Sequence, residues 1–434
     1  MSSLALLVPF LAAPAQDPAP ASAAAARALF EPELRVLHEF VGEAAGDQFG
    51  WIGRNAGDCD GDRVNDVLLS APSHADGGPW AGRIYVYSGK SGALLFTNVG
   101  QPGDQLGIGI ERAGDVNKDG FADVIAGAPG AQRSRGQALV YSGKDGSVLL
   151  TLPGEAPGDN FGRKVSDAGD VDGDGHADVL VGADQSDSAG VDAGRAYLFS
   201  GKDGKRLLTL DGEMPGDKFG VSLAGTTQGG STWILVGAGD AGEKQGGRAY
   251  VFEWKPGAEA ELVYTVEADE TGVGLGRMFV SWVGDIDKDG FPDAYVSDWE
   301  NNARGPSTGR VYVHSGKSGE RLHVLTGEHA GDGFGIGTAD VGDCDGDGHA
   351  DLLIGAWQCR EGAASGGKCY LYSGKSGALV SAWVCTVAGE TFGFDTTGMG
   401  DVDGDGAIDY LITNAWSGVV GRQSGRAFLL AGSR

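Results

Sequence analysis

Six short segments rich in aspartate hold the residues best suited to chemistry in this sequence. Each reads Asp-x-[Asp/Asn]-x-Asp-Gly-x-x-Asp or a close variant. They span Asp58–Asp66, Asp115–Asp123, Asp170–Asp178, Asp285–Asp293, Asp343–Asp351 and Asp401–Asp409. Oxygens at positions 1, 3 and 5 of a tight loop converge on one point, and glycine at position 6 permits the turn. Hard oxygen ligands in a flexible cage favour Ca²⁺ over Mg²⁺.

The predicted calcium ligands are the side chains at positions 1, 3, 5 and 9 and the main-chain carbonyl at position 7. They are Asp58, Asp60, Asp62, Val64, Asp66, Asp115, Asn117, Asp119, Phe121, Asp123, Asp170, Asp172, Asp174, His176, Asp178, Asp285, Asp287, Asp289, Phe291, Asp293, Asp343, Asp345, Asp347, His349, Asp351, Asp401, Asp403, Asp405, Ala407 and Asp409. The imidazoles at position 7 receive no role. An EF-hand needs Glu at position 12, where the third segment has Val181 inside a strand. Asx-turns between strands are the alternative, which six charge-dense copies in register disfavour.

Two departures limit the number of metal ions. The first loop carries Arg63 where the others have glycine, so we expect this loop to be the least suited to a cation. Between Phe219 and Gly237 the motif is absent, and Trp233 stands in the place of the final aspartate. We therefore expect up to six Ca²⁺ ions and none in the fourth unit.

These loops belong to a unit that is repeated seven times, with 55 to 59 residues between copies. A Phe-Gly phrase marks each copy, and its aromatic or leucine residue falls at Phe49, Leu106, Phe161, Phe219, Leu275, Phe334 and Phe392. Each unit contains four short β-type segments joined by hairpin-type connections. Seven such units predict an all-β fold, a seven-bladed β-propeller of four-stranded antiparallel blades.

The predicted boundaries leave one strand for closing the ring. We expect a single propeller over 33–432, with blades near 42–99, 100–153, 154–211, 212–266, 267–326, 327–384 and 385–432. The last unit ends after its third strand, whereas residues 33–41 resemble a fourth strand. We therefore expect the N-terminal strand to complete the seventh blade.

The repeated unit resembles the FG-GAP repeat family, the seven-bladed propeller at the head of integrin alpha chains. The resemblance rests on Phe49-Gly50, Phe161-Gly162, Phe219-Gly220, Phe334-Gly335 and Phe392-Gly393, with Ala71-Pro72 and Gly127-Ala128-Pro129. It covers about residues 33–432 and implies calcium loops at the observed place. FG-GAP propellers serve adhesion, glycan contact and scaffolding alike. Because no stalk domain or membrane helix is expected here, an integrin-type receptor role is not carried over.

Composition and the N-terminus indicate export and exclude other classes. The 434 residues carry 33 Lys and Arg against 60 Asp and Glu, a net charge of −27 that repels nucleic acid. An apolar run over residues 4–13 and the phrase Ala13-Pro14-Ala15 predict a signal peptide at 1–15, followed by an Ala/Pro-rich linker at 16–32. The apolar run is too short to span a bilayer. We expect a secreted or periplasmic monomer.

The remaining residues favour binding over catalysis. No nucleophile motif or metalloprotease motif is present, and Gly-Lys-Ser at 89–91 and elsewhere marks a recurring hairpin turn. The connections between the second and third strands of the units vary most, and several of them carry tryptophans. These form either a stacking platform or core between blades, and they are Trp80, Trp299, Trp357 and Trp416. Cys359 and Cys369 are placed for a cross-strand disulfide, whereas Cys59, Cys344 and Cys385 have no predicted partner. The predicted function is an extracellular module that binds a protein or glycan, with a calcium-dependent carbohydrate-active enzyme as the alternative.

Overall fold

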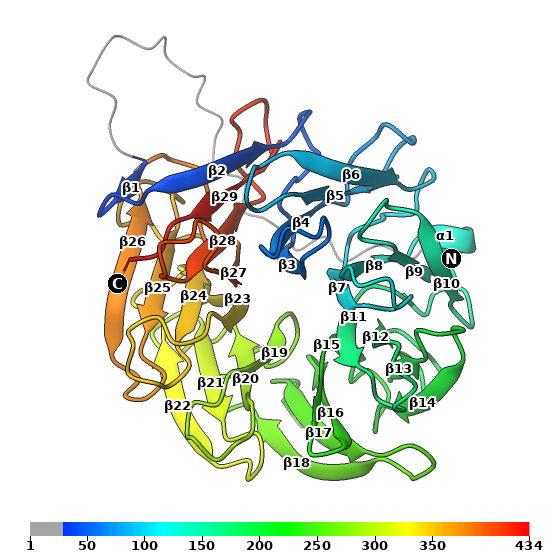
Figure 1. Ribbon diagram of the computed structural model, residues 1–434. Coiled ribbons are helices and arrows are strands. Elements are labelled where there is room, and N and C mark those ends of the chain that lie inside the picture. The colour runs from blue at the N-terminus through cyan, green and yellow to red at the C-terminus, as the bar shows by residue number, and fades with distance from the viewer. Residues whose placement is uncertain (1–28, 243, 434) are drawn as a thin grey trace.

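The computed structural model describes residues 29–242 and 244–433 and forms seven antiparallel sheets arranged around one axis (Figure 1). The predicted all-β seven-bladed propeller is confirmed. In blades 1 to 5 the strands follow chain order from the axis outward, as in β3-β4-β5-β6. The signal peptide predicted at 1–15 and most of the linker lie outside the described residues.

The strands of the first three blades are short and similar in length. Blades 1, 2 and 3 contain β3 (Gly53–Gly57), β4 (Asp66–Ala71), β5 (Arg83–Tyr87), β6 (Leu94–Val99), β7 (Ile110–Gly114), β8 (Asp123–Ala128), β9 (Gln137–Tyr141), β10 (Val148–Pro153), β11 (Val165–Gly169), β12 (Asp178–Ala183), β13 (Arg195–Phe199) and β14 (Arg206–Asp211). A four-residue helical turn, α1 (Ala131–Ser134), lies between β8 and β9.

Blade 4 has a longer first hairpin than its neighbours. Blades 4 and 5 contain β15 (Phe219–Gln228), β16 (Ser231–Ala238), β17 (Arg248–Trp254), β18 (Glu261–Glu267), β19 (Val280–Val283), β20 (Asp293–Asp298), β21 (Arg310–His314) and β22 (Arg321–Thr326). Blades 6 and 7 contain β23 (Phe334–Asp340), β24 (Leu352–Ala356), β25 (Lys368–Tyr372), β26 (Leu379–Cys385), β27 (Asp395–Gly400), β28 (Asp409–Asn414) and β29 (Arg426–Leu430).

The chain ends close the ring at two places. The predicted N-terminal strand is present as β2 (Val36–Val41), which pairs with β29 as the fourth strand of blade 7. A shorter strand, β1 (Phe30–Glu31), was not predicted and pairs with β26 as a fifth strand of blade 6. The Phe30 ring lies 4.6 Å from that of Phe392, centroid to centroid, and is 2% exposed. A two-residue strand inside an Ala/Pro-rich stretch gives no periodic signal in the sequence.

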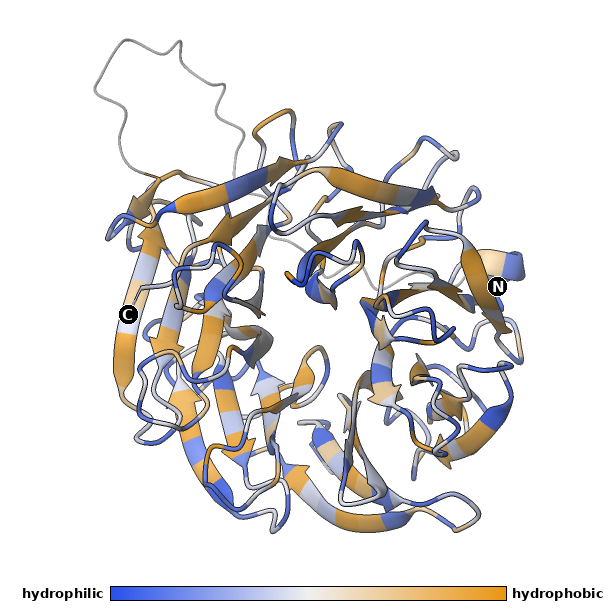
Figure 2. Cartoon of the chain, viewed as in Figure 1, coloured by the Kyte–Doolittle hydropathy of each residue, from blue (hydrophilic) through white to orange (hydrophobic). Residues whose placement is uncertain are grey.

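The Phe-Gly phrases connect neighbouring blades. Phe161 is buried against Tyr197 of its own blade, and its main chain forms a parallel bridge to Gly136 of the preceding blade. Phe49 makes the same bridge to Gly425 of blade 7 and so closes the circle. Leu106 occupies the position in blade 2 and is also buried, because any large apolar side chain fills this site. The strands carry most of the hydrophobic residues and the connections most of the polar ones (Figure 2).

Candidate metal centres

Each of the six aspartate-rich loops connects the first and second strands of its blade. In blade 3 the Asp170 carboxylate accepts the Gly175 N–H (2.8 Å), and Asp172 accepts the Asp174 N–H (3.1 Å). Asp174 in turn accepts the His176 N–H (3.0 Å). Each ionised carboxylate has about four acceptor positions, so these bonds leave it able to bind a cation as well.

The loop carboxylates lie close enough together to hold an ion. Ligand atoms within 4.8 Å of one another occur in several loops, among them Asp58, Asp60 and Asp62; Asp170, Asp172 and Asp178; Asp285, Asp287 and Asp289; and Asp343, Asp345 and Asp347. An all-oxygen donor set of this density fits Ca²⁺. The residues present therefore fit the cation expected from the sequence.

The final aspartate of each loop has a structural task in addition to its predicted ligand role. Asp178 is fully buried, and its carboxylate accepts the N–H groups of Val171 and Gly201, both at 2.8 Å. Gly201 belongs to the Ser-Gly-Lys turn, so this carboxylate ties the loop to that turn. The same two bonds occur at Asp66, Asp123, Asp293, Asp351 and Asp409.

Burial disfavours the charged form of these final aspartates. It raises the pKa of four of them to about 6, namely Asp66, Asp123, Asp178 and Asp293. It also raises the pKa of Asp351 and Asp409. A divalent cation in the loop would oppose this effect, because an adjacent positive charge favours the carboxylate.

The loop that we expected to be least suited to a cation keeps the common geometry. Arg63 adopts φ 69°, in the left-handed region where the equivalent Gly120 has φ 87°. The Arg63 N–H still reaches Asp58 at 2.8 Å, and its side chain is exposed to solvent. The turn thus forms around Arg63 as it does around glycine in the other loops.

Blade 4 replaces the loop by a tight turn at Gly229 and Gly230, between β15 and β16. Trp233 pairs with Glu253 at the place that Asp178 holds in blade 3, as the sequence predicts. Its ring packs edge-on against Phe291 of blade 5, with centroids 4.7 Å apart. An apolar contact between blades thus stands where other blades have a buried carboxylate.

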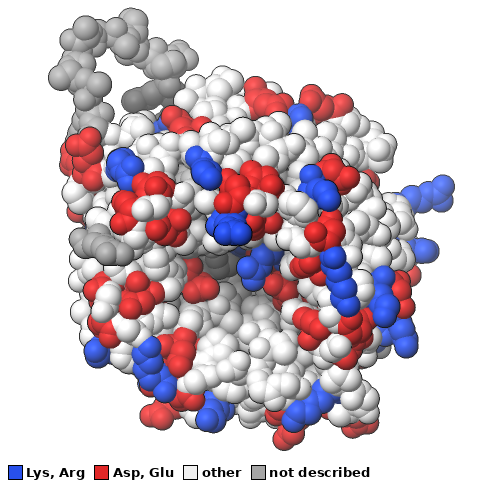
Figure 3. Space-filling model, viewed as in Figure 1, with Lys and Arg blue, Asp and Glu red and all other residues white. Residues whose placement is uncertain are grey.

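Side-chain cations already face several loops. Lys202 of the Ser-Gly-Lys turn lies 3.4 Å from Asp174, and Lys90 lies 3.6 Å from Asp62. Blade 7 has no such turn, because its fourth strand comes from the N-terminus. There Arg35, just before β2, contacts both Asp403 and Asp405. Acidic patches with basic residues beside them surround the central hollow in Figure 3.

The tryptophans predicted as a binding set divide into a cluster and an outlier. Trp299 lies 6.4 Å and Trp416 lies 6.5 Å from Trp357, measured between ring centroids. Trp51, which sequence reasoning missed, joins them 6.4 Å from Trp416. Trp357 is 5% exposed, whereas Trp80 is 53% exposed and makes no ring contact within residues 29–242 and 244–433.

The predicted disulfide between Cys359 and Cys369 is absent, and all five cysteines are free thiols. The two side chains enter different parts of the core. Cys359 packs with Phe334 and Trp357 toward blade 5, whereas Cys369 packs with Phe392 toward blade 7. Cys359 lies in the connection after β24, whereas Cys369 lies on β25, and the two thiols are buried in different clusters of the core.

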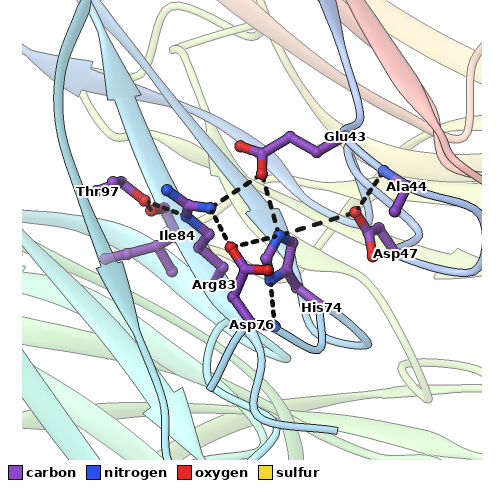
Figure 4. A network of polar contacts seen from close by, with 8 residues as sticks. All are labelled: Glu43, Ala44, Asp47, His74, Asp76, Arg83, Ile84 and Thr97. Atoms are coloured by element: carbon purple, nitrogen blue, oxygen red, sulfur yellow. Dashed lines mark hydrogen bonds and ion pairs between the residues drawn. The ribbon is translucent and has the colours of Figure 1, made fainter. Parts of the chain in front are cut away.

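Blade 1 holds a polar network that the sequence did not single out (Figure 4). The buried His74 places Nε2 3.3 Å from Glu43 and 3.8 Å from both Asp47 and Asp76. Arg83 bridges Glu43 and Asp76 at 3.0 and 3.2 Å. Comparison of the seven repeated units could have revealed His74, because the six other blades have small residues at the equivalent position. These residues are Ala131, Ser186, Ala241, Asn301, Cys359 and Ser417.

The hydrogen bonds of His74 argue against a metal in this network. Its Nδ1 accepts the main-chain N–H of Asp76 at 3.2 Å, so the neutral ring carries its proton on Nε2. A metal at Nε2 would require a proton on Nδ1, facing that N–H group. The network is better explained as a variant of the Arg–acid pair found in other blades, such as Arg195–Glu155 at 2.9 Å.

Comparison with known proteins agrees with the fold and the loops. A model of the FG-GAP repeat matches residues 112–147 and 165–199. Integrin alpha-PS5 of Drosophila melanogaster is 34% identical over 166 residues, which cover 35% of this chain and 16% of that protein. Integrin alpha-4 of Xenopus laevis is 32% identical over 172 residues, 37% of this chain and 16% of that protein. The chain thus matches about a sixth of the length of these relatives.

The solved structure of Saccharomyces cerevisiae Sqt1 aligns with 85% of this chain and 81% of its own, with a TM-score of 0.51 at 11% identity. This likeness concerns the fold alone. The chain is a seven-bladed β-propeller that contains FG-GAP repeats. It is distantly homologous to integrin alpha chains. Among its described helices, none has the length and apolar character needed to cross a membrane.

Proposed function

We propose that this chain is a secreted or periplasmic calcium-binding propeller that acts as a binding or adhesion module for an extracellular protein or glycan. One observation carries the proposal: the two faces of a single rigid ring differ in kind. One face repeats the same carboxylate loop six times, whereas the other presents connections of variable length and sequence. Variable loops on a rigid scaffold are the usual place for recognition.

The aromatic residues of the variable face indicate the kind of contact. Trp80 exposes its ring at blade 1, and the cluster of Trp51, Trp299 and Trp416 is partly exposed around the buried Trp357. Exposed aromatic rings stack on sugar faces or serve as hot spots for protein partners. The cluster is continuous with the core between blades 5 and 7, so its inner members also stabilise the fold.

Binding to an immobilised panel of glycans and polysaccharides in millimolar Ca²⁺, repeated with chelator, tests this function. Trp80→Ala and Trp299→Ala are the variants to compare, because Trp357→Ala removes a core residue. Calcium-dependent binding that is lost in a folded Trp80→Ala variant supports a glycan module. Absence of binding by folded protein favours a protein partner, and size-exclusion chromatography tests the expected monomer.

A carbohydrate-active enzyme is the second candidate, and the central channel supports it. A cavity of about 230 Å³ is lined by the innermost strands of the blades. Burial lowers the pKa of Lys164 to about 8, and burial raises the pKa of Asp167 and Asp340 in the same cavity. Perturbed titratable groups in a cavity are typical of acid–base sites. Release of products from any polysaccharide of the panel would favour this function over binding alone.

A further inference from the structure

Two histidines at position 7 of their loops connect neighbouring metal loops. His176 occupies position 7 of the blade 3 loop, and its Nδ1 lies 2.6 Å from the main-chain oxygen of Val116. Val116 is position 2 of the blade 2 loop, between Asp115 and Asn117. Because a carbonyl oxygen only accepts hydrogen bonds, Nδ1 must carry the proton. The imidazole therefore fixes the main chain between two predicted ligands of the neighbouring loop.

A lysine makes the connection in the opposite direction. Lys118 stands at position 4 of the blade 2 loop with φ 61°, and its Nζ donates to the main-chain oxygen of Asp174 in the blade 3 loop. The ammonium group lies against Gly175, at position 6 of that loop. Four of the other loops have glycine at position 4, namely Gly61, Gly173, Gly346 and Gly404. Lysine at this position is thus specific to certain loops.

The histidine bond recurs between blades 5 and 6, where a lysine again stands at position 4 of the preceding loop. His349 Nδ1 lies 2.6 Å from the main-chain oxygen of Ile286, position 2 of the blade 5 loop. Lys288 at position 4 of that loop has φ 66°, and its Nζ lies 4.0 Å from where a Cβ on Gly348 would stand. Position 7 of the blade 1 and blade 7 loops holds Val64 and Ala407, which cannot make this bond. The histidine bond thus occurs twice, each time between a Lys-containing loop and the His-containing loop that follows it, and between blades 2 and 3 the lysine bond accompanies it.

We propose that the metal loops of blades 2 and 3, and those of blades 5 and 6, are coupled pairs in which a cation in one loop raises the affinity of the other. This inference rests on the proposed calcium-binding function. A cation in the blade 3 loop takes the His176 carbonyl as a ligand, and so orders the imidazole that holds Val116. It also orders Asp174, to which Lys118 is bound. The second loop then loses less conformational entropy on binding, which is positive cooperativity.

Electrostatic repulsion between the two cations acts in the opposite direction. Salt screens this repulsion over a Debye length of about 8 Å at physiological ionic strength. The carboxylates around each ion reduce it further, in a chain with a net charge of −27. We therefore expect the ordering effect to prevail.

Terbium luminescence tests the coupling in the full chain. Tb³⁺ replaces Ca²⁺ in oxygen sites, and Phe121→Trp at position 7 of the blade 2 loop makes luminescence report on that loop. Other tryptophans also sensitise bound Tb³⁺, so the luminescence of the unsubstituted chain is subtracted. The difference reports on Tb³⁺ in the blade 2 loop. The blade 3 loop is disabled by Asp170→Asn with Asp172→Asn, and the blade 6 loop by Asp343→Asn with Asp345→Asn as the matched control.

We expect disabling the blade 3 loop to weaken Tb³⁺ binding at the blade 2 loop about five- to tenfold, and the blade 6 control to leave it unchanged. His176→Ala with Lys118→Gly uses residues found at these positions in other loops. These two substitutions should make the blade 2 loop insensitive to the state of the blade 3 loop. Circular dichroism and thermal unfolding verify that each variant is folded.

The outcomes separate the coupling from the metal-binding function. If Phe121→Trp adds no luminescence in folded protein, both the proposed cation binding by the blade 2 loop and the proposed coupling are wrong. If Tb³⁺ binds the blade 2 loop equally well, or more tightly, when the blade 3 loop is disabled, the coupling alone is overturned. An equal loss from the blade 6 control would also overturn it, because the effect would then be global.

Discussion

Blades 3 and 4 are neighbours in one ring but close their first hairpin in different ways. Blade 3 uses strands of five and six residues, a carboxylate loop and the buried Asp178. Blade 4 uses strands of ten and eight residues, a two-glycine turn and the buried Trp233. The comparison teaches that the carboxylate loop is one of two ways to close the first hairpin of a blade, and that the second way buries no charged side chain.

The comparison also explains why a metal-free loop carries a cost. In blade 3 a buried carboxylate holds two N–H groups in an environment that opposes its charge. In blade 4 the equivalent side chain gains stability from apolar burial against Phe291. Six blades should therefore depend on a cation for part of their stability, and blade 4 should not.

Calcium should produce the largest change in stability. A ligand that binds only the folded state adds about 2.7 kcal/mol per site at a hundredfold excess over its Kd, and several loops add together. We expect the thermal midpoint to rise steeply from metal-free protein to millimolar Ca²⁺, measured by differential scanning calorimetry. Mg²⁺ at the same concentration is the control. An unchanged midpoint would contradict the metal function of the loops.

Truncation of the blade 4 residue should have the next largest effect. Trp233→Ala removes a large buried ring, and such substitutions cost about 3–5 kcal/mol of unfolding free energy. The loss should be the same with and without Ca²⁺, because blade 4 provides no cation loop. Urea unfolding in both conditions measures it. A loss that doubles in Ca²⁺ would show that blade 4 and the cation loops are not independent.

The pH dependence of the metal-free protein should reveal the final aspartates. Burial raises the pKa in the folded state to about 6 for Asp66, Asp123, Asp178 and Asp293, against an ordinary value of 3.8. Between these values the folded state binds more protons than the unfolded state, so the unfolding free energy falls as pH rises from 4 through 6. We expect a loss on the order of 1 kcal/mol per group, seen by urea unfolding of metal-free protein at pH 5 and 7.

The controls for this pH effect are calcium and a neutral side chain. Added Ca²⁺ should remove the loss, because a cation favours the carboxylate form. Asp178→Asn should reduce the loss of unfolding free energy between pH 5 and 7 by the contribution of one carboxylate, because the amide does not titrate. Metal-free protein that is more stable at pH 7 than at pH 5 would contradict the assignment.

Features that repeat could be predicted from the sequence, and features that occur once could not. Five Phe-Gly and two Leu-Gly phrases in register predicted the propeller, and the matching fourth-strand pattern predicted the place of β2 in blade 7. The two-residue β1 and the His74 network each occur once and leave no period to detect. The predicted disulfide between Cys359 and Cys369 is wrong because Cys359, in the loop after β24, enters a different cluster of the core from Cys369 on β25.

The candidate site was predicted at the level of loops but not of contacts between loops. The carboxylate pattern gave the residues that converge, including those of the loop with Arg63. It did not give the bonds from His176 and Lys118 to the neighbouring loop, because these depend on how adjacent blades are positioned. Similarly, exposure separates Trp80 from Trp357, and periodicity says nothing about exposure.

Arg63 permits the smallest and sharpest test of the shared loop geometry. A non-glycine residue in the left-handed region costs about 1 kcal/mol of stability, and substitution by glycine relieves this strain. Part of the relief is offset because glycine has greater conformational freedom in the unfolded chain. We therefore expect Arg63→Gly to stabilise metal-free protein by about 0.5 kcal/mol. Removing a positive charge beside Asp58 and Asp62 should also strengthen calcium binding at this loop. Urea unfolding and calcium titration measure the two effects, with the exposed Lys205→Gly as a control for charge alone. A destabilised Arg63→Gly variant would mean that the arginine side chain, and not only its main chain, supports the blade 1 loop.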